Sequence, residues 1–432
     1  MSPELVGLIG VVVLFILMML RMWVAATMAV VGFMGIVYLK GFEQAFAAIT
    51  QTPFVFIADY NFSVAPMFML MGTVISEMGI GADLFYAVYK WLGQFRGGLA
   101  IATTGASAVF AAIVGDSMSG IIVFSKTALP EMRKFKYSDF LSSGVIAAGA
   151  TMGILIPPSM GFVLYGIMTE QSVGKLFMAG VLPGILQAVS YIVTIIIWCR
   201  IKPDAGPAGM KTTFKEKIFS LQKTWAVVAL ILLVLGGIYG GIFTATEGGA
   251  VGAMGAIIIT AVTGRLSKKS FQNVLRETGL LTAMFFLIMI GVPIFRRFVT
   301  VSQIAVWMGN TITSSQISPF LILIVIVLMY LVLGCFMNST MILVLTLPII
   351  YPLITGLGFD PIWFGVISVR LVEIGDITPP FGMNAFMLAG LTKIPVWTVY
   401  RGVIPFLMAD IVNIVLLISI PAISLFLPNT MM

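Results

Sequence analysis

Apolar stretches of about twenty residues recur from one end of the chain to the other, and they restrict its fold more than any other feature. A helix that crosses a membrane needs about 20 mostly apolar residues, because its backbone groups must bond to one another in lipid. Ten stretches have the composition of a single crossing: residues 5–20, 22–39, 56–78, 137–170, 174–199, 225–243, 247–263, 278–296, 359–391 and 399–427. Only 9% of the residues are charged, against about 25% in soluble domains. The sequence therefore predicts an all-α polytopic membrane protein and excludes a soluble enzyme.

Two further apolar stretches, residues 97–132 and 318–355, are too long for one crossing. Each has a polar, helix-breaking centre: GDSMSG at 115–120 and MNST at 337–340. Irregular backbone at membrane depth survives only where it is buried in protein or faces a water-filled cavity. We expect each stretch to be a re-entrant hairpin that turns at mid-depth. Two full crossings joined by a tight loop would preserve the same parity and remain an alternative.

The basic residues test this topology. With the N-terminus outside, 18 of the 24 Lys and Arg residues fall on the inner side and four fall outside, while Lys126 and Arg370 lie within membrane segments. Positive charge marks cytoplasmic loops, and a single crossing at either long stretch would move every later basic loop to the wrong side. The net charge of +7 is therefore explained by membrane topology, and no nucleic-acid partner is expected. The first apolar segment is interpreted as a retained span and not as a signal peptide.

Several kinds of chemistry lack the residues they need. The chain has no His, which removes imidazole as a proton relay, metal ligand or catalytic base. Cys199 and Cys335 lie far apart in apolar stretches and are expected to be buried thiols. No phosphate-binding loop, nucleophile elbow or metal-ligand cluster is present, so enzyme activity has no support from the sequence.

The two halves of the chain share a pattern of unusual residues. A shift of 222 residues places Asp116-Ser117 on Asn338-Ser339 and Gly153 on Gly375 without a gap. The same shift places Pro157-Pro158 on Pro379-Pro380. By the topology above, the first copy starts outside and the second inside. We therefore predict inverted repeats, which are typical of secondary transporters.

Each copy contains a break within an otherwise apolar span, GILIPPS at 153–159 and GDITPP at 375–380. Two consecutive prolines remove backbone donors and should unwind about one turn, which frees carbonyl oxygens at mid-membrane. Carbonyl and hydroxyl oxygens suit a hard cation such as sodium. One predicted cation site has Asp116, Ser117 and Ser119 with backbone near Gly153, and the other has Asn338, Ser339, Thr340, Gly375, Asp376 and Thr378.

Other interpretations of these residues remain open. The breaks could be kinks whose backbone groups are satisfied by neighbouring helices. Asp116 and Asp376 could each be a buried acid bonded to backbone N–H groups at a helix start. For an anionic substrate we expect contacts from Ser159 and Asn384, with Arg370 as a further candidate. Arg370 lies three residues before Glu373, so an intrahelical pair is equally compatible with the spacing, and Lys126 could extend to the cytoplasmic interface.

Local patterns predict two amphipathic helices and one cap. Apolar residues recur at helical spacing in 81–95 and again in 302–313, which indicates helices lying in opposite membrane interfaces. Thr244 and Glu247 fit a capping box at a helix start. Arg296 and Arg297 lie on the outer side, where they form a solvated helix end or dock an acidic partner.

These features resemble the large membrane subunit of TRAP (tripartite ATP-independent periplasmic) transporters. The resemblance runs over essentially the whole chain and is clearest at 236–247 (GGIYGGIFTATE), 359–365 (FDPIWFG) and 373–382 (EIGDITPPFG). It implies an ion-transporter architecture of the elevator type, in which sodium ions bind at the hairpin tips and drive uptake of organic acid anions. It also implies a multi-pass subunit of the bacterial inner membrane, a separate small four-helix membrane subunit and a periplasmic substrate-binding protein.

The resemblance also implies a division of the chain. Residues 1–78 and 225–296 would be scaffold helices, with interfacial arm helices at 79–96 and 300–316. Residues 97–199 would form the first transport repeat, with hairpin 97–132 and broken helix 137–170. Residues 318–427 would form the second, with hairpin 318–355 and broken helix 359–391, and residues 200–224 would be a cytoplasmic linker.

Two other functions are compatible with the same pattern. A self-sufficient sodium/dicarboxylate symporter would share the fold but need no binding protein. A non-transporting scaffold or a passive channel belongs to a different class. Polar breaks in symmetric positions argue against a scaffold, and a channel would conduct without saturation.

Overall fold

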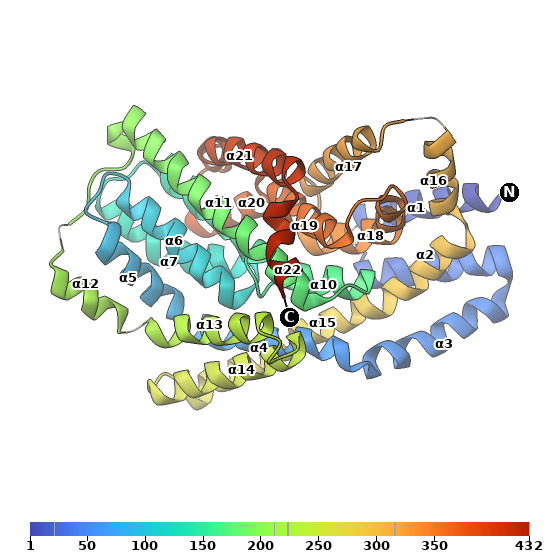
Figure 1. Ribbon diagram of the computed structural model, residues 1–432, viewed down its shortest axis with the longest axis horizontal. Helices are drawn as coiled ribbons and strands as arrows, with labels where there is room; N and C mark the ends of the chain where they lie inside the picture. The colour runs from blue at the N-terminus through green and yellow to red at the C-terminus, as the bar shows by residue number, and fades with distance from the viewer. Residues whose placement is uncertain (21, 211, 223, 315–316, 432) are drawn as a thin grey trace.

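The computed structural model describes residues 1–20, 22–210, 212–222, 224–314 and 317–431, and every regular element in these ranges is helical (Figure 1). Three basic residues used in the topology, Arg21, Lys211 and Lys223, lie outside the described residues, as do the last two residues of the predicted arm 300–316. Six of the described helices are long and apolar enough to cross a membrane, or up to eight when each of two bent pairs is counted as one span. The prediction of ten crossings also includes α1 and α2, which have 17 residues each.

The N-terminal and central helices pack mainly with one another. α2 packs along α15, and α4 packs along both α14 and α15. α4 and the following helix α5 are bent by 65°. The bounds in this part of the molecule are α1 Pro3–Met19, α2 Val24–Lys40, α3 Phe42–Ala58, η1 Tyr60–Ser63, α4 Val64–Glu77, α5 Ile80–Leu92, α13 Trp225–Tyr239, α14 Ala245–Val262, α15 Lys268–Val301 and α16 Ile304–Ser314.

The two repeats have the same order of elements. Each consists of a helical hairpin, a broken helix and a long helix. In the first repeat these are α6 Gly98–Val114, α7 Ser117–Lys134, α8 Asp139–Ala150, α9 Met152–Leu155, α10 Met160–Thr169 and α11 Val173–Ile201. In the second they are α17 Pro319–Gly334, α18 Ser339–Gly356, α19 Pro361–Ile377, α20 Met383–Thr392, α21 Val396–Ser419 and α22 Ala422–Thr430.

The hairpins and the broken helices are thus confirmed. The first broken helix stops at Leu155 and resumes at Met160, and the second stops at Ile377 and resumes at Met383. Both gaps contain the consecutive prolines, which lack the N–H that would continue the helix. The repeats also interlock in a symmetric way, because α7 packs against α20 while the corresponding α18 packs against α10.

The first halves of the broken helices lie deepest in the molecule. Every residue of α19 from Ile362 to Ile377 is buried, and so is every residue of α8 from Leu141 to Ala150. α8 packs against α21, and α19 packs against α11, α17, α18 and α21. The polar groups at the ends of α8 and α19 are therefore enclosed by protein on all sides.

Three segments differ from the sequence prediction. Residues 42–58 form a helix, α3, which overlaps only the start of the span expected over 56–78, and the span expected over 399–427 is divided at Pro421 into α21 and α22. Pro421 has no backbone N–H to donate, so it ends the helical bonding there. The linker 200–224 contains η2 Pro203–Ala205 and α12 Phe214–Leu221, and its backbone accepts bonds from Gly97 and Ser138.

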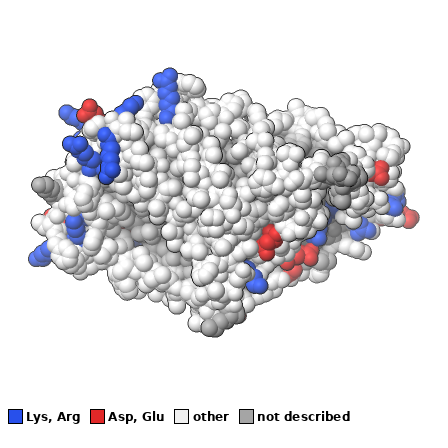
Figure 2. Space-filling view, turned by 45° about the horizontal axis from the view of Figure 1, so that its top comes forward, with Lys and Arg blue, Asp and Glu red and all other residues white. Residues whose placement is uncertain are grey.

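On the face shown in Figure 2, charged side chains gather toward the two ends of the molecule. In Figure 2, Lys and Arg gather at the end where α12 lies, on the left in both views. Acidic and basic residues are mixed toward the opposite end, and the surface between them is largely white. This distribution agrees with a membrane band bounded by a basic inner side. The capping box is confirmed, because Thr244 N donates to Glu247 Oε2 (2.8 Å) and Glu247 N donates to Thr244 Oγ1 (3.2 Å).

Candidate functional site

Both hairpin tips are helix N-caps. Asp116 Oδ2 accepts a bond from Ser119 N at 2.8 Å and starts α7, and Asn338 Oδ1 accepts from Met341 N at 2.8 Å and starts α18. Gly115, at φ +67°, makes the left-handed turn before the first cap. The interpretation of Asp116 as an acid bonded to backbone at a helix start is therefore correct for one of its two oxygens. Asp116 and Asn338 occupy equivalent positions and form the same kind of N-cap, although only Asp116 can carry a charge.

The first tip lies against the first break. A Cβ on Gly153 would lie 2.6 Å from the carbonyl oxygen of Asp116, and one on Gly115 would lie 2.7 Å from the carbonyl oxygen of Pro158. Such distances leave room only for glycine. The structure thus brings Asp116 and Ser117 together with Gly153, as the sequence predicts. Ser117 is buried, and Asp116 and Ser119 are half-buried.

The second tip lies against the second break and makes side-chain contacts with it. Ser339 Oγ lies 2.6 Å from Asp376 Oδ2 and 3.3 Å from Glu373 Oε1. A Cβ on Gly334, at the end of α17, would lie 2.5 Å from Gly375 Cα, so the two helices meet backbone to backbone. Asn338, Ser339, Gly375 and Asp376 therefore form one cluster.

The two carboxylates of this cluster are incompletely bonded. Asp376 Oδ1 and Glu373 Oε2 are buried and have no hydrogen-bond partner among the described residues. A buried polar oxygen without a partner costs free energy, so such a group points to a ligand. Oxygen donors from Ser339, Asp376 and Glu373 are of the kind that a hard cation such as sodium prefers. The described residues contain no group of three or more His, Cys, Asp or Glu side chains that could hold a metal ion.

Glu373 was missed as a member of this cluster, although a signal was available. Residues three apart share a helix face, so Glu373 had to lie beside Asp376 once that residue was assigned to the site. Its spacing from Arg370 is the same, and the sequence interpretation considered Glu373 only as one possible partner of Arg370.

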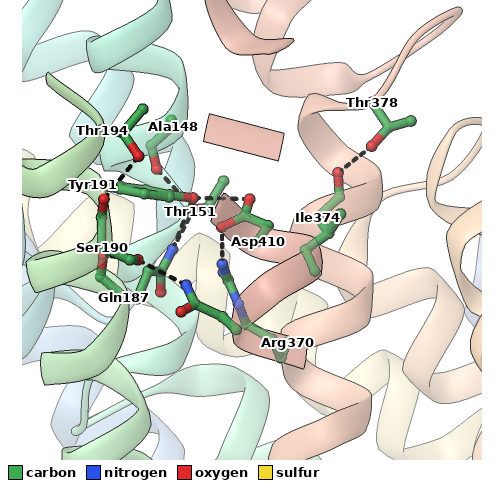
Figure 3. Close-up of polar contacts among 11 residues, drawn as sticks. Ala148, Thr151, Gln187, Ser190, Tyr191, Thr194, Arg370, Ile374, Thr378 and Asp410 are labelled. Atoms are coloured by element: carbon green, nitrogen blue, oxygen red, sulfur yellow. Dashed lines mark hydrogen bonds and ion pairs between the residues drawn. The ribbon is translucent and has the colours of Figure 1, made fainter. Parts of the chain in front are cut away.

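The remaining predicted site residues differ in burial and in hydrogen bonding. Thr378 Oγ1 donates to Ile374 O at 2.6 Å, within the last turn of α19 (Figure 3). Thr340 is exposed at the tip. Ser159 caps α10 by accepting from Phe162 N at 3.3 Å, and its hydroxyl donates to Ile154 O. Asn384 is buried near the start of α20, and its Nδ2 has no partner in the described part of the chain.

Arg370 forms an ion pair with Asp410 of α21 (Figure 3), and both side chains are completely buried. The intrahelical pair with Glu373 is therefore wrong, because α21 brings a carboxylate directly to the guanidinium. Asp410 was missed, although an acid within an apolar span is a signal of a buried function. Arg370 Nε and Nη1 have no partner among the described residues.

The Arg370–Asp410 pair belongs to a polar network that joins the two repeats. Tyr191 Oη donates to Asp410 Oδ2 at 3.0 Å, and Gln187 Nε2 donates to Thr151 Oγ1 at 2.8 Å, next to Tyr191 (Figure 3). The network connects the end of α8 with α11, α19 and α21. Asp410 is the ion-pair partner of Arg370, and none of the ion pairs found among the described residues includes Glu373 or Asp376.

Inverted repeats, interlocked hairpins and paired tip–break contacts define the chain as a secondary-transporter-type membrane protein. A family model described as the tripartite ATP-independent periplasmic transporter, DctM component, matches residues 11–423, and the chain belongs to this family. The resemblance seen in the sequence is thereby confirmed.

Relatives in the family include transporters of different substrates. The chain is 36% identical over 371 residues, 86% of each chain, to the C4-dicarboxylate TRAP transporter large permease protein DctM of Pseudomonas aeruginosa. It is 33% identical over 449 residues, 98% of each chain, to the protein of the same name from Vibrio cholerae. It is 30% identical over 374 residues, 86% of this chain and 87% of the relative, to the sialic acid TRAP transporter large permease protein SiaM of Vibrio cholerae.

Two solved structures are similar in fold. The YdaH transporter of Alcanivorax borkumensis matches with a TM-score of 0.64 at 13% identity, covering 88% of this chain and 89% of that chain. The MtrF structure of Neisseria gonorrhoeae matches with a TM-score of 0.56 at 12% identity, covering 97% and 95%. At these identities the similarity concerns the fold alone.

Proposed function

We propose that this chain is the large membrane subunit of a sodium-coupled, binding-protein-dependent importer of an organic acid anion in the bacterial inner membrane. The observation that carries the proposal is the cluster of Ser339, Glu373 and Asp376, in which each buried carboxylate keeps one oxygen without a partner among the described residues. A cation that entered this cluster would complete the bonding of both oxygens.

The proposed coupling rests on charge. Glu373 and Asp376 lie near the end of α19, where every residue from Ile362 to Ile377 is buried. Two uncompensated negative charges in such a place cost several kcal/mol. Sodium ions bound at the second tip, and at the first tip near Asp116, Ser117, Ser119 and Gly153, reduce the negative charge of the carboxylates and of the bound substrate anion. A body loaded with both carries less net charge than one loaded with substrate alone, so it can move more easily through the low-dielectric region. When only sodium or only the substrate anion is bound, the net charge opposes that movement.

The packing supports an elevator motion. α2, α4, α14 and α15 pack mainly with one another, and the hairpins and broken helices pack mainly among themselves. We assign the first group to the scaffold, residues 1–78 and 225–296, and the second to the transport repeats, residues 97–199 and 318–427. The helices α5 and α16 correspond to the arms that connect the two bodies.

The substrate class follows from the relatives and from the polar groups near the site. The relatives named above carry C4-dicarboxylates and sialic acid, so we propose a dicarboxylate or a sugar acid. The free Nδ2 of Asn384 offers a donor to a carboxylate, and we keep Ser159 and Arg370 as further candidates for substrate contacts. A small four-helix membrane subunit and a periplasmic binding protein complete the proposed complex.

The test is uptake by the complete complex in proteoliposomes, with a sodium gradient directed inward and a panel of succinate, sialic acid and citrate. We expect one acid to accumulate only with sodium and only with the binding protein present. Asp376→Asn should raise the sodium concentration for half-maximal uptake by about tenfold, which corresponds to about 1.4 kcal/mol. The control is Asp360→Asn on the same helix, because Asp360 accepts from Trp363 N as an N-cap and Asn caps equally well.

Two outcomes would contradict the proposal. Uptake that continues unchanged in sodium-free buffer would show that sodium is not the coupling ion. Accumulation without the binding protein would identify a self-sufficient sodium/dicarboxylate symporter instead.

A further inference from the structure

A cavity of about 310 Å³ lies between α7 and α20, on the inner side of the molecule by the topology above. α7 is the second arm of the first hairpin, and α20 is the second half of the second broken helix. The cavity is lined by Ser125, Lys126, Leu129, Pro130, Arg133, Leu391 and Thr392. Its volume is within the range of small-molecule sites, which begins at about 300 Å³.

The cavity has a basic wall. Lys126 and Arg133 are seven residues apart on α7, which places them on the same face about 10 Å apart. Arg133 Nε bonds to Asp139 Oδ1 at 3.3 Å. In the ranges that the structure describes, no carboxylate lies within ion-pair distance of Lys126. The charge of Lys126 is thus free to attract an anion.

Lys126 lies within the predicted membrane segment, where an unpaired charge needs an explanation. It lies six residues before residue 132, where the predicted membrane hairpin ends, which is about 9 Å along the helix. A charge at that depth is costly unless it faces water or a counter-charge. Lys126 is exposed and lines the cavity, so water or an anion in the cavity can contact its ammonium group.

The two repeats differ in the side chains at the equivalent contact. The shift of 222 residues places Gln171 on Lys393 and Tyr351 on Leu129. In the outer copy, between α10 and α18, Gln171 Nε2 donates to Tyr351 Oη at 2.9 Å. The inner copy has no pair of side chains that could form the equivalent bond, since Leu129 has no polar group. A hydrogen bond therefore joins α10 and α18 in the outer copy, whereas a basic cavity lies between α7 and α20 in the inner copy.

The hydroxyl groups of the cavity indicate how an anion would be held. Ser125 Oγ donates to Ile122 O at 3.0 Å, and Thr392 Oγ1 donates to Leu388 O at 2.7 Å. Both hydroxyl hydrogens are therefore used within their own helices. An anion in the cavity would be bound by charge, without the directional donors that give shape selectivity. Weak binding of this kind suits a step at which a substrate leaves.

We propose that the α7–α20 cavity is an anion-binding subsite on the cytoplasmic side, where a carboxylate of the substrate pairs with Lys126 before release. This inference rests on the proposed import of an organic anion. The site takes small organic acids from solution. A lipid phosphate would share the attraction to Lys126, and the experiment separates the two sources.

The experiment measures protection of a cysteine placed in the cavity. Thr392→Cys is introduced into the complete complex, and inverted membrane vesicles expose its cytoplasmic face to a charged methanethiosulfonate reagent. The native thiols give little background, since Cys199 and Cys335 are 2% and 8% exposed. We expect succinate or sialic acid to slow labelling, and we expect protection to need a concentration about tenfold higher when Lys126→Met is added. Lys126→Arg keeps the charge and should keep the protection.

A matched control is available on the same helix. Lys134 is exposed at the end of α7 and lies 3.8 Å from Glu131, and it does not line the cavity. Lys134→Met removes one positive charge from the same end of the molecule and should leave protection of Thr392→Cys unchanged. If Lys126→Met and Lys134→Met change the protection equally, the effect comes from the general surface charge, and the proposed subsite is overturned.

Four other outcomes would decide on the subsite or on the proposed import. Equal slowing by chloride at the same ionic strength would mean that ions only screen the reagent, and this overturns the subsite. Slowing that depends on phosphatidylglycerol in the vesicles and not on added acid would assign the cavity to a lipid headgroup. If the complex accumulates an acid that gives no protection, the subsite fails and the importer stands. If an acid protects but none is accumulated, the cavity binds anions and the proposed import fails.

Discussion

Arg296 Nη1 lies 3.0 Å from Glu170 Oε1, and this ion pair connects α15 to the end of α10. α15 packs with the scaffold helices, and α10 is part of the first transport repeat. The sequence left Arg296 as a solvated helix end or a docking point for an acidic partner. If the two bodies slide past one another, as we propose, this pair must open in every cycle.

The first prediction concerns the strength of this contact. Both side chains are more than half exposed, and such pairs contribute about 0.2–1 kcal/mol. Arg296→Gln should therefore change the rate of uptake by no more than about fivefold, and less at high salt. The exchanged pair Glu170→Arg with Arg296→Glu should return the rate toward that of the native protein. Uptake rates measured at low and high ionic strength check this.

A covalent version of the contact gives a sharper result. A reducible bis-methanethiosulfonate cross-linker, long enough to replace the two long side chains, should stop uptake when it joins Glu170→Cys and Arg296→Cys, and reduction should restore it. Uptake that continues with the cross-link intact would show that α10 and α15 do not separate during transport. The single cysteine variants, treated with the same reagent, are the controls.

The second prediction concerns the buried pair of Arg370 and Asp410. Arg370→Met leaves Asp410 charged and without its partner, which costs about 3–5 kcal/mol in comparable buried pairs. Adding Asp410→Asn removes the stranded charge and should restore most of the lost thermal stability. Unfolding of the detergent-solubilised protein, followed by size-exclusion chromatography after heating, measures both variants.

The same pair of variants tests the proposed substrate contact of Arg370. If Arg370 acts only within the Tyr191–Asp410 network, the stable double variant should transport with an unchanged KM for the acid. A large rise in KM at preserved stability would instead support a contact with the substrate. Equal stability of Arg370→Met and the native protein would contradict the buried ion pair itself.

The parts of the fold that follow from short-range rules could be predicted from the sequence. Consecutive prolines end α9 and α19, and a residue with a short polar side chain starts each hairpin's second arm, at Asp116 and Asn338. These are local properties of backbone donors and acceptors. The symmetric position of both signals in the two repeats was enough to indicate hairpins, breaks and the contacts between them.

The parts that depend on packing between distant segments could not be predicted in this way. Arg370 has a carboxylate three residues along its own helix, yet its partner is Asp410, 40 residues away on α21. Sequence spacing describes which groups are neighbours on one helix and gives no information on which face another helix covers. For the same reason the sequence offered Glu373 only as a possible partner of Arg370 and did not indicate its contact with Ser339.

The third prediction concerns the close approach of α17 and α19. A Cβ on Gly375 would overlap the backbone of Gly334, and backbone atoms cannot move aside as a side chain can. Gly375→Ala should therefore force the second tip away from the second break and weaken both sodium coupling and stability. The control is Gly390→Ala in α20, where a Cβ meets nothing within 4 Å and alanine favours the helix by about 0.5–1 kcal/mol. Sodium-dependent uptake and thermal stability are measured for both, and a fully coupled Gly375→Ala variant would contradict the contact.

The fourth prediction separates the two roles of Asp116. As an N-cap it needs an oxygen that accepts from Ser119 N, and asparagine provides one, as Asn338 does at the second tip. Asp116→Asn should therefore leave thermal stability unchanged, whereas Asp116→Ala should lower it by about 1 kcal/mol. If the carboxylate also binds sodium, both variants should raise the sodium concentration needed for half-maximal uptake, because both remove the charge. If Asp116→Asn transports with the native sodium dependence while Asp116→Ala only loses stability, Asp116 is a cap alone, and the first cation site would have to be built from Ser117, Ser119 and the backbone near Gly153.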